Sequence, residues 1–387
     1  MTDQGVKTGP AVALIGPSQK FLSGISYFTL RLSNALADFS PVNTILFRNM
    51  LPKNLFPGWK RVGTGQVTYH FRQDVRHWEI LDWYNPVSWL RGAAIAEKND
   101  IIIFQWWTSS VAHMYLAISL LNWKKRPVII EFHEIVDPLE SGFFVLRVYS
   151  RLMGTLIRRM AGFYVVHSEA DRQLVSSHYH IDKDRVRVIP HGLYDQYEKI
   201  DREKAKKILG IDRRNIILFF GLLRPYKGVK DLIKAFEQLP GDVLENSQLL
   251  IVGEAWEDTV SIRLAEVSPA RAHISLINRY IGDDEVPTYF SAADMLVIPY
   301  TRASQSGVAH IGMSFGLPII ASDVGGLSES LRKYQGTVFV SPGETGQLTE
   351  ALVRVTGALH VFEPPGELRW EKTAERWKIL MHEILDK

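Results

Sequence analysis

The chain has 387 residues, a formal net charge of +3, and 46% hydrophobic against 22% charged residues. This length exceeds one ordinary hydrophobic core, so we expect two globular domains of a soluble protein. The absence of cysteine excludes disulfides, thiolate metal sites and a cysteine nucleophile. The nearly balanced charge gives no reason to expect nucleic acid as a partner. Neither a signal pattern nor a run of about 18 apolar residues is present, so we expect a cytoplasmic protein.

The first half of the sequence predicts a doubly wound α/β domain. Short apolar runs of the kind buried in parallel sheets alternate with helix-length segments. These predicted strands lie at 11–15, 45–47, 101–104, 128–130, 164–166 and 186–189. In such a sheet, ligands bind outside the carboxyl ends of the strands. Gly24, at the first loop-to-helix junction, permits close approach of the backbone to a ligand, although helix-start geometry explains a glycine there equally well.

His133 follows the fourth of these strands almost directly. A histidine at this edge points toward the ligand cleft, where it can bond a sugar hydroxyl or an acid group. The other interpretation is that His133 has a purely structural role. His167, His191 and His310 occupy comparable positions, so a histidine by itself does not single out one site. We predict no metal site, because no His-Glu-x-x-His pattern is present and His133 and Glu134 diverge on a strand.

The second half repeats the pattern as another αβ domain of similar size. Its predicted strands lie at 216–220, 248–252, 274–277, 295–298, 319–321 and 337–340. After the first of them comes the loop Gly221-Leu-Leu-Arg-Pro-Tyr-Lys-Gly228. Arg224 offers a planar fork and Lys227 a point charge, so together they can grip two adjacent phosphates. The alternative is a solvated loop with two ordinary charges.

The stretch from Pro299 to Gly326 predicts a strand, a loop, a helix, a second strand and a Gly-rich loop, with both loops at the ligand edge. The first loop, at Ser306-Gly307, offers free backbone N–H groups and the positive end of a helix dipole, both of which suit a phosphate. Doubly wound folds also contain such units without using them, so this stretch alone does not decide the function.

Taken in order, these residues resemble the family 4 retaining glycosyltransferases of the GT-B type. The loop at 221–228 is similar to the family's Gly-Arg…Lys-Gly phosphate grip, with a shorter spacing, and Ile189-Pro-His-Gly192 is similar to its linker signature. Gly316 to Gly326 matches Gly-x-Pro-Val-Val-Ala-Thr-Asp-x-Gly-Gly closely, and Ala292-Ala-Asp294 precedes the donor loop as in the family. The resemblance covers nearly the whole chain.

The resemblance implies an α/β fold of GT-B architecture, with two facing Rossmann-like doubly wound domains. It places an acceptor-side domain at 1–194, a nucleotide-sugar-binding domain at 195–364, and a C-terminal helix at 365–387 that packs back on the first domain. The implied reaction transfers a sugar from a nucleotide-diphosphate donor to a glycan, lipid-linked or small-molecule acceptor with retained anomeric configuration. Neither a metal nor another cofactor is implied.

The resemblance also implies the site residues. His133 would hydrogen-bond the transferred sugar near its reacting carbon, and Arg224 and Lys227 would stabilise the leaving diphosphate, which makes these three the catalytic residues. The donor-binding residues would be Gly24, Gly221, Tyr280, Ser304, Gln305, Ser306, Gly307 and Val308.

The donor loop departs from the family pattern. Members usually carry two glutamates there, the first bonding sugar hydroxyls and the second the nucleotide ribose. This sequence has Ala303 and Ile311 at those positions. Residues 304–306 are neutral polar substitutes close to the first position, and nothing nearby replaces the second. The base and sugar of the donor therefore stay open.

Two rival functions also stay open. A catalytically degenerate GT-B protein that binds a nucleotide or a partner would fit the missing glutamates. A sugar-nucleotide epimerase shares the architecture but is expected to need a carboxylate pair in the cleft, which the donor loop lacks. A dinucleotide oxidoreductase is disfavoured because neither half shows Gly-x-Gly-x-x-Gly after its first strand.

The acceptor would lie on the first half of the chain. Residues 39–73 include five basic residues and no acidic one, with Phe56 and Trp59 among them. The predicted helix at 142–160 has arginines on one side, opposite apolar residues: Arg147, Arg151 and Arg158 against Phe144, Val148 and Leu152. Both features suggest a surface for an anionic lipid or lipid-linked glycan, and hence a peripheral contact with the inner face of a membrane. Solvated loops and an ordinary amphipathic helix packed on the sheet are the alternative.

Overall fold

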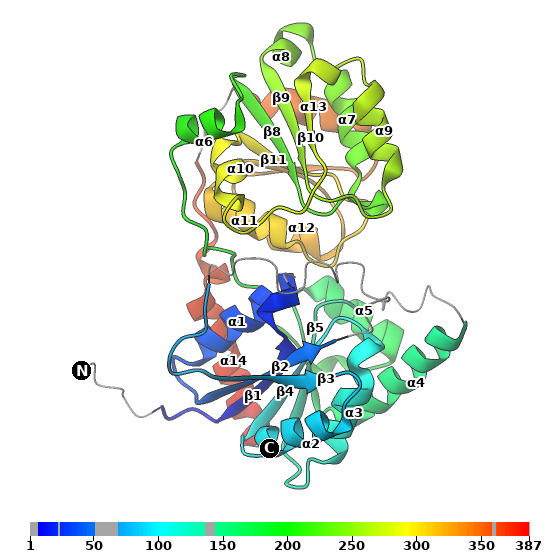
Figure 1. The fold of residues 1–387 in the computed structure, drawn as a ribbon, viewed down its shortest axis with the longest axis vertical. Coiled ribbons are helices and arrows are strands. Elements are labelled where there is room, and N and C mark those ends of the chain that lie inside the picture. The colour runs from blue at the N-terminus through cyan, green and yellow to red at the C-terminus, as the bar shows by residue number, and fades with distance from the viewer. Residues whose placement is uncertain (1–6, 22–23, 51–68, 136–143, 358–360, 387) are drawn as a thin grey trace, which may run out of the picture. The chain divides into compact units, whose positions relative to one another are not determined.

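The structure is a computed structural model that describes residues 7–21, 24–50, 69–135, 144–357 and 361–386. The chain forms two compact units, one of residues up to Gly192 together with Glu367 onward, and one of Leu193–Gly366. Each unit is built on one parallel sheet with helices against it (Figure 1). The predicted α/β class with two doubly wound sheets is confirmed.

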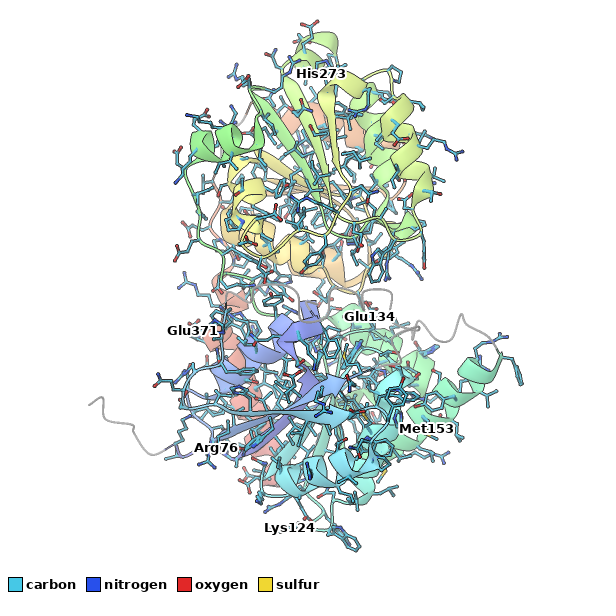
Figure 2. All side chains as sticks on the ribbon, viewed as in Figure 1. Arg76, Lys124, Glu134, Met153, His273 and Glu371 are labelled. Atoms are coloured by element: carbon cyan, nitrogen blue, oxygen red, sulfur yellow. The ribbon has the colours of Figure 1, made fainter. Side chains whose placement is uncertain are left out.

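The sheet of the first unit has seven parallel strands in the order β3-β2-β1-β4-β5-β6-β7. Their bounds are β1 Val12–Pro17, β2 Val42–Asn49, β3 Arg76–Asp82, β4 Ile101–Trp106, β5 Val128–Phe132, β6 Phe163–Val166 and β7 Val186–Val188. The strand order reverses between β1 and β4, the point at which doubly wound folds bind ligands. The sequence predicted about six strands and missed β3, because this edge strand carries polar, partly exposed residues such as Arg76 rather than an apolar run (Figure 2).

Two hydrophobic cores lie on the two faces of this sheet. One contains residues of α1 (Gly24–Leu36) and α14 (Trp370–Leu385). The other contains residues of α2 (Pro86–Ala96), α3 (Ala112–Leu120), α4 (Phe144–Met160) and α5 (Glu169–Tyr179). Successive residues of β1 alternate between the cores: Val12 and Leu14 face the first, and Ala13 and Ile15 the second. Burial on both faces explains why these strands read as continuous apolar runs.

The last helix, α14, belongs to the first unit although unit two precedes it in the chain. Its apolar residues recur every three or four positions and are buried with the core under α1; these are Trp370, Ala374, Trp377, Leu380, Met381 and Ile384. The backbone at Gly192 runs so close to Trp370 that a Cβ there would lie 2.4 Å from the indole ring. The helix is therefore a structural part of the first sheet's packing.

The second unit repeats the doubly wound arrangement with six parallel strands in the order β10-β9-β8-β11-β12-β13. The strands are β8 Asn215–Phe220, β9 Ser247–Val252, β10 Ile274–Ile277, β11 Met295–Ile298, β12 Ile319–Ser322 and β13 Thr337–Val340. The helices are α6 Arg202–Leu209, α7 Val229–Glu237, α8 Gly241–Glu245, α9 Thr259–Val267, α10 Val286–Ala292, α11 Gly307–Phe315, α12 Gly325–Leu331 and α13 Thr345–Val355. All six strands predicted for this half are present.

Helix α4 differs from its predicted orientation. Its buried positions include Ser150, Gly154 and Ile157, whereas the apolar residues Phe144, Val148 and Leu152 are 72%, 48% and 54% exposed. Arg147 and Arg151 are also exposed, so the arginines adjoin the apolar stripe rather than oppose it. Arg158 lies apart from them, half-buried, with its guanidinium 3.9 Å from the centre of the Tyr179 ring.

The predicted basic stretch is only partly described. Lys53, Phe56, Trp59, Lys60 and Arg61 lie outside the described residues. The two arginines that are described have acidic neighbours from elsewhere in the chain. Arg72 binds Asp38 and Asp74, and an Arg48 nitrogen lies 3.7 Å from an Asp82 oxygen. In the folded chain, acidic neighbours therefore offset the positive charge of the two described arginines of this stretch.

Candidate functional site

The loop after β8 holds the two predicted phosphate-binding cations in a tight turn. Residues Pro225–Lys227 form a single 3-10 turn that ends at Gly228 in the left-handed conformation, with φ +66°. A Cβ at Gly228 would lie 1.9 Å from the carbonyl oxygen of Pro299, which leaves no room for a side chain. The turn is therefore fixed against the segment that follows β11, and it presents Arg224 and Lys227 at the carboxyl edge of the sheet.

Neither cation has a carboxylate partner among the described residues. The Arg224 guanidinium lies 5.1 Å from the Trp256 ring, and its Nε is buried without a hydrogen-bond partner among the described residues. The Lys227 ammonium lies 5.1 Å from the Tyr300 ring. Burial, and secondarily the charge of Arg224, lower the pKa of Lys227 to about 8. Two uncompensated cations at a ligand edge favour an anionic ligand.

The predicted donor-loop residues come close to Lys227. A Cβ placed on Gly221 would lie 3.2 Å from Lys227 Nζ and 3.4 Å from Val308 Cγ2, so these three predicted residues meet at one point. Ser306 caps α11 by accepting a hydrogen bond from the Ala309 N–H. Val308, whose side chain lies near Gly221, thus belongs to the first turn of α11, where backbone N–H groups are left without helical partners.

Gln305 stands out in this loop because both polar atoms of its side chain are buried without a partner among the described residues. Ser304 is half-buried beside it. At the two positions where the family usually has glutamate, Ala303 is half-buried and Ile311 is 8% exposed. Ile311 belongs to the apolar packing of α11, so the second carboxylate has no polar substitute at its own position.

Tyr280 lies in the loop between β10 and α10. A carboxylate that the sequence reasoning missed lies three residues later. Asp283 is 7% exposed, accepts a hydrogen bond of 3.2 Å from the Tyr197 hydroxyl, and has no described partner at Oδ2. Burial and the neighbouring Asp284 raise the pKa of Asp283 to about 7. Asp283 stands in the acidic run Asp283-Asp284-Glu285, which reads as an exposed loop and does not reveal this burial.

Gly24 and His133 belong to the first unit. Gly24 is the exposed first residue of α1. His133 directly follows β5, with 6% of its side chain exposed, and burial lowers its pKa to about 3, so the imidazole is neutral. Glu134, labelled in Figure 2, is exposed, as expected because neighbouring residues on a strand point in opposite directions.

His133 has two titratable neighbours that the sequence reasoning did not pair with it. Glu131 lies two residues earlier on the same side of β5, and its Oε2 is 3.7 Å from His133 Nε2. The His167 ring centre is 5.0 Å from that of His133. The sequence signal for this group is the two-residue spacing of Glu131 and His133 on β5 and the equivalent position of His167 on the next strand, which a short linear ligand motif does not contain.

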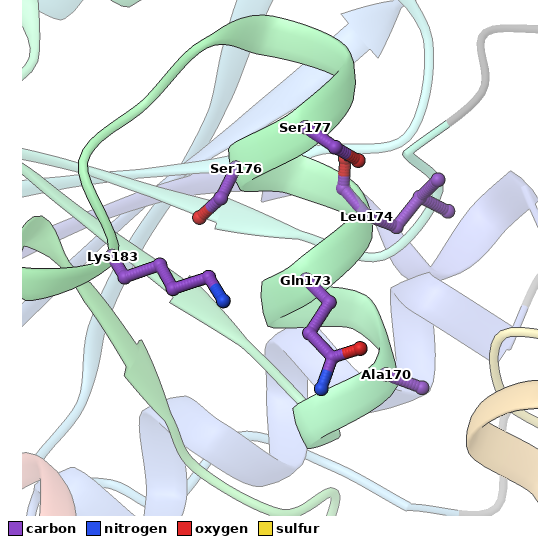
Figure 3. Close-up of a pocket in the computed structure, with 6 residues that line it drawn as sticks. All are labelled: Ala170, Gln173, Leu174, Ser176, Ser177 and Lys183. Carbon is purple, nitrogen blue, oxygen red and sulfur yellow. The ribbon is translucent and has the colours of Figure 1, made fainter.

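Two surface cavities of the first unit lie apart from the predicted site residues. The depression shown in Figure 3 is lined by α5 residues and Lys183, with none of the predicted site residues among its lining. A smaller cavity lies beside α4 and α5 and is lined by Trp106, Ser150, Arg151, Thr155, Arg158, His178 and Tyr179. Its lining has two arginines and no carboxylate among the described residues.

Comparison with known proteins identifies the class. The model of the glycosyl transferases group 1 matches residues 201–356, and that of glycosyltransferase family 4 matches residues 22–196, so that together they match most of the chain. The protein is therefore a GT-B glycosyltransferase by fold and family. More particularly, the chain belongs to family 4.

Solved structures share this fold over almost the whole chain. Anabaena HepE in complex with UDP has a TM-score of 0.64 at 16% identity and covers 97% of this chain and 98% of its own. WaaG, described as a glycosyltransferase of lipopolysaccharide biosynthesis, has a TM-score of 0.59 at 16% identity with the same coverage. At these identities the likeness establishes the architecture.

Curated relatives match over shorter spans. The D-inositol 3-phosphate glycosyltransferase of Corynebacterium glutamicum is 30% identical over 201 residues, which are 49% of this chain and 46% of the relative. The 2-deoxystreptamine glucosyltransferase of Streptomyces kanamyceticus is 26% identical over 182 residues, or 45% and 43%. The matched part is thus less than half the length of these two relatives. No helix among the described residues is long and apolar enough to cross a membrane.

Proposed function

We propose that the chain transfers a sugar from a nucleotide-diphosphate donor to a glycan or lipid-linked acceptor, with retention of anomeric configuration. The observation that carries the donor part is the pair Arg224 and Lys227, two cations without described carboxylate partners, of which Lys227 lies beside Gly221 and Val308. Solved structures of the same fold include Anabaena HepE with UDP and with UDP-glucose, which supports a nucleotide-diphosphate sugar here. Retention rests on the family resemblance.

The proposed chemistry follows from where charge develops. When the bond from the anomeric carbon to the diphosphate breaks, negative charge grows on the departing oxygens. Arg224, Lys227 and the N–H groups at the start of α11 stabilise that charge, and they do so more strongly when water is excluded. We assign His133 to the transferred sugar, to which its neutral imidazole presents a hydrogen-bonding nitrogen.

Gln305 would replace the first missing glutamate as the group that reads the sugar hydroxyls. Its amide offers both a donor and an acceptor, and both are buried without a described partner, which is costly unless a ligand satisfies them. A carboxylate only accepts hydrogen bonds, whereas an amide both donates and accepts them. Gln305 would therefore favour a nucleotide sugar whose hydroxyl groups both accept and donate hydrogen bonds.

The test is a binding and turnover panel with UDP, GDP and their sugars. A nucleotide at 100 times its Kd should add about 2.7 kcal/mol of stability to the unit that binds it. Lys227→Ala should remove this stabilisation, whereas Lys230→Ala, an exposed lysine on α7, should not. His133→Ala should bind the nucleotide but lose sugar transfer. Unchanged transfer in His133→Ala or Lys227→Ala would remove that residue from the site.

The same panel separates the two rival functions. A degenerate nucleotide-binding protein, which the residues Ala303 and Ile311 favour, would bind a nucleotide without hydrolysing or transferring its sugar. An epimerase would convert one sugar nucleotide into another without any acceptor. Product analysis by NMR gives the anomeric configuration of a transferred sugar, and an inverted product would contradict the retaining mechanism.

We also propose that α4 binds the surface of an anionic membrane, in which a lipid-linked acceptor would lie. Its exposed stripe of Phe144, Val148 and Leu152 adjoins the exposed Arg147 and Arg151, and the helix contains no acidic residue. An apolar stripe beside cations is the arrangement of helices that lie in a membrane interface. Anionic lipid headgroups add about 1 kcal/mol for each basic residue near the surface.

Liposome co-sedimentation tests this surface. We expect binding to vesicles with anionic phospholipid and weaker binding to zwitterionic vesicles. The double variant Phe144→Ser with Leu152→Ser should lose binding while retaining nucleotide affinity. A matched control is Val260→Ser, an apolar residue 59% exposed in the second unit. Equal binding to both vesicle types would contradict the proposal.

A further inference from the structure

The first unit contains a buried convergence of three ligand-type atoms beneath α1. Strands β5 and β6 pair in parallel with Glu131 beside Val165, so the residues two positions on, His133 and His167, are also neighbours. Glu131 and His133 lie on one side of β5 because side chains alternate along a strand. A carboxylate oxygen of Glu131 and one ring nitrogen from each histidine all lie within 4.8 Å of one another.

Each side chain of this cluster has a polar atom with no described protein partner. Glu131 Oε1, His133 Nε2 and His167 Nε2 are each buried without a hydrogen bond to any described residue. A buried polar atom left unsatisfied costs about 1–3 kcal/mol. Unsatisfied atoms on three neighbouring side chains therefore favour a bound group that satisfies them together.

The surrounding groups orient these atoms inward. His167 Nδ1 lies 3.0 Å from the Ile189 carbonyl oxygen, which holds the proton on Nδ1 and leaves the Nε2 lone pair free. Gln105 Nε2 donates to Glu131 Oε2 at 3.3 Å, and Gln105 in turn accepts a hydrogen bond from the Thr29 hydroxyl. Carboxylate ligands and histidine ligands in metal sites are held by such outer hydrogen bonds.

The surroundings of the cluster supply no described cation. Glu131 is fully buried, and no lysine or arginine among the described residues pairs with it. The Phe28 ring lies 4.6 Å and 5.3 Å from the two imidazole centres and adds an apolar wall.

We propose that Glu131, His133 and His167 bind a divalent transition-metal ion of the Zn²⁺ class. Two imidazole nitrogens and one carboxylate oxygen are a ligand set that Zn²⁺ accepts, with a further position left for water. Coordination through His133 Nε2 keeps the proton on Nδ1, so the ring retains an N–H donor for a sugar. The site consists of first-unit residues alone and does not depend on the proposed transfer reaction.

The test uses the full chain, stripped with a chelator and then titrated with Zn²⁺. One equivalent of Zn²⁺ should bind and raise the melting temperature. Glu131→Gln and His167→Gln should each weaken binding at least ~tenfold, the loss seen even for outer-shell partners. His191→Gln is the matched control, since His191 is also a buried histidine beside Phe28 but contributes no atom to the cluster.

A spectroscopic measurement on the unaltered protein guards against variants that fail to fold. Co²⁺ in place of Zn²⁺ should give the visible absorption of a four-coordinate nitrogen and oxygen site, and Zn²⁺ should displace it. Failure of the unaltered chain to bind Zn²⁺ would overturn the proposal and leave a shared proton or a bridging water as the occupant. Binding that is unchanged in both Glu131→Gln and His167→Gln would also overturn it, as adventitious surface binding.

Discussion

At the scale of single residues, Lys227 is a cation with no described carboxylate partner, and we propose that it binds the donor diphosphate. Its ammonium lies by the Tyr300 ring and beside Gly221, where a side chain would come within 3.2 Å of Nζ. Burial disfavours the charged form and lowers the pKa to about 8. A bound diphosphate would supply the missing negative charge and restore the proton.

The pH dependence at Lys227 has opposite signs for binding and for stability. Nucleotide affinity should fall as the pH rises through about 8, because the ammonium loses its charge. Stability of the free protein should instead rise between about 8 and the ordinary lysine pKa of 10.5, because the unfolded chain holds the proton more tightly. Calorimetric titration of UDP or GDP at several pH values measures the first effect and thermal unfolding the second.

Two variants isolate this group. Lys227→Arg keeps its charge over this range, so its nucleotide affinity should be flat where the unaltered protein's declines. Lys227→Ala should reduce turnover by about two orders of magnitude, similar to the loss of one oxyanion-hole donor. A Lys227→Arg profile that still falls near pH 8 would assign the titration to another residue.

At the scale of elements, close packing fixes the conformation of the short turn between β8 and α7. Gly228 ends the turn at a positive φ, and its Cα faces the Pro299 carbonyl oxygen. Since Pro299 immediately follows β11, the contact joins the phosphate turn to the strand that leads into the donor loop. The two segments proposed to bind the diphosphate are therefore in contact through their backbones.

Gly228→Ala should destabilise the second unit and abolish nucleotide binding. The left-handed conformation alone costs an alanine about 1–2 kcal/mol, and the contact with Pro299 adds to this because the backbone must move. Gly210→Ala is a matched control, with φ +67° and nothing within 4 Å of the added Cβ. Thermal unfolding of both variants separates the two contributions, and equal losses would show that the contact with Pro299 carries no weight.

At the scale of the whole molecule, the chain returns to its first unit through α14. Trp377 is fully buried there, and Trp370 packs beside Gly192, so the last residues complete the core that the first residues begin. The stability of the first unit therefore depends on residues separated from it in sequence by the entire second unit.

Trp377→Ala should destabilise the first unit by about 3–5 kcal/mol through loss of burial and the cavity left behind. Ile379→Ala, at a position 55% exposed on the same helix, should change stability by less than about 0.5 kcal/mol. Differential scanning calorimetry should show the transition of the first unit shift while that of the second stays in place. A shift confined to the second transition would contradict this assignment of α14.

Local sequence by itself determined most of the strands and the tight turn at 225–228. Buried parallel strands are continuous apolar runs, and turns need particular residues such as Pro225 and Gly228, so both can be recognised without the fold. The tertiary structure decided the rest. It added β3, whose polar residues hide an edge strand, and it turned the apolar stripe of α4 outward beside its arginines. It also brought His167 to His133, because strand register, which sets neighbours across a parallel sheet, is a property of the folded sheet and of no short stretch of sequence.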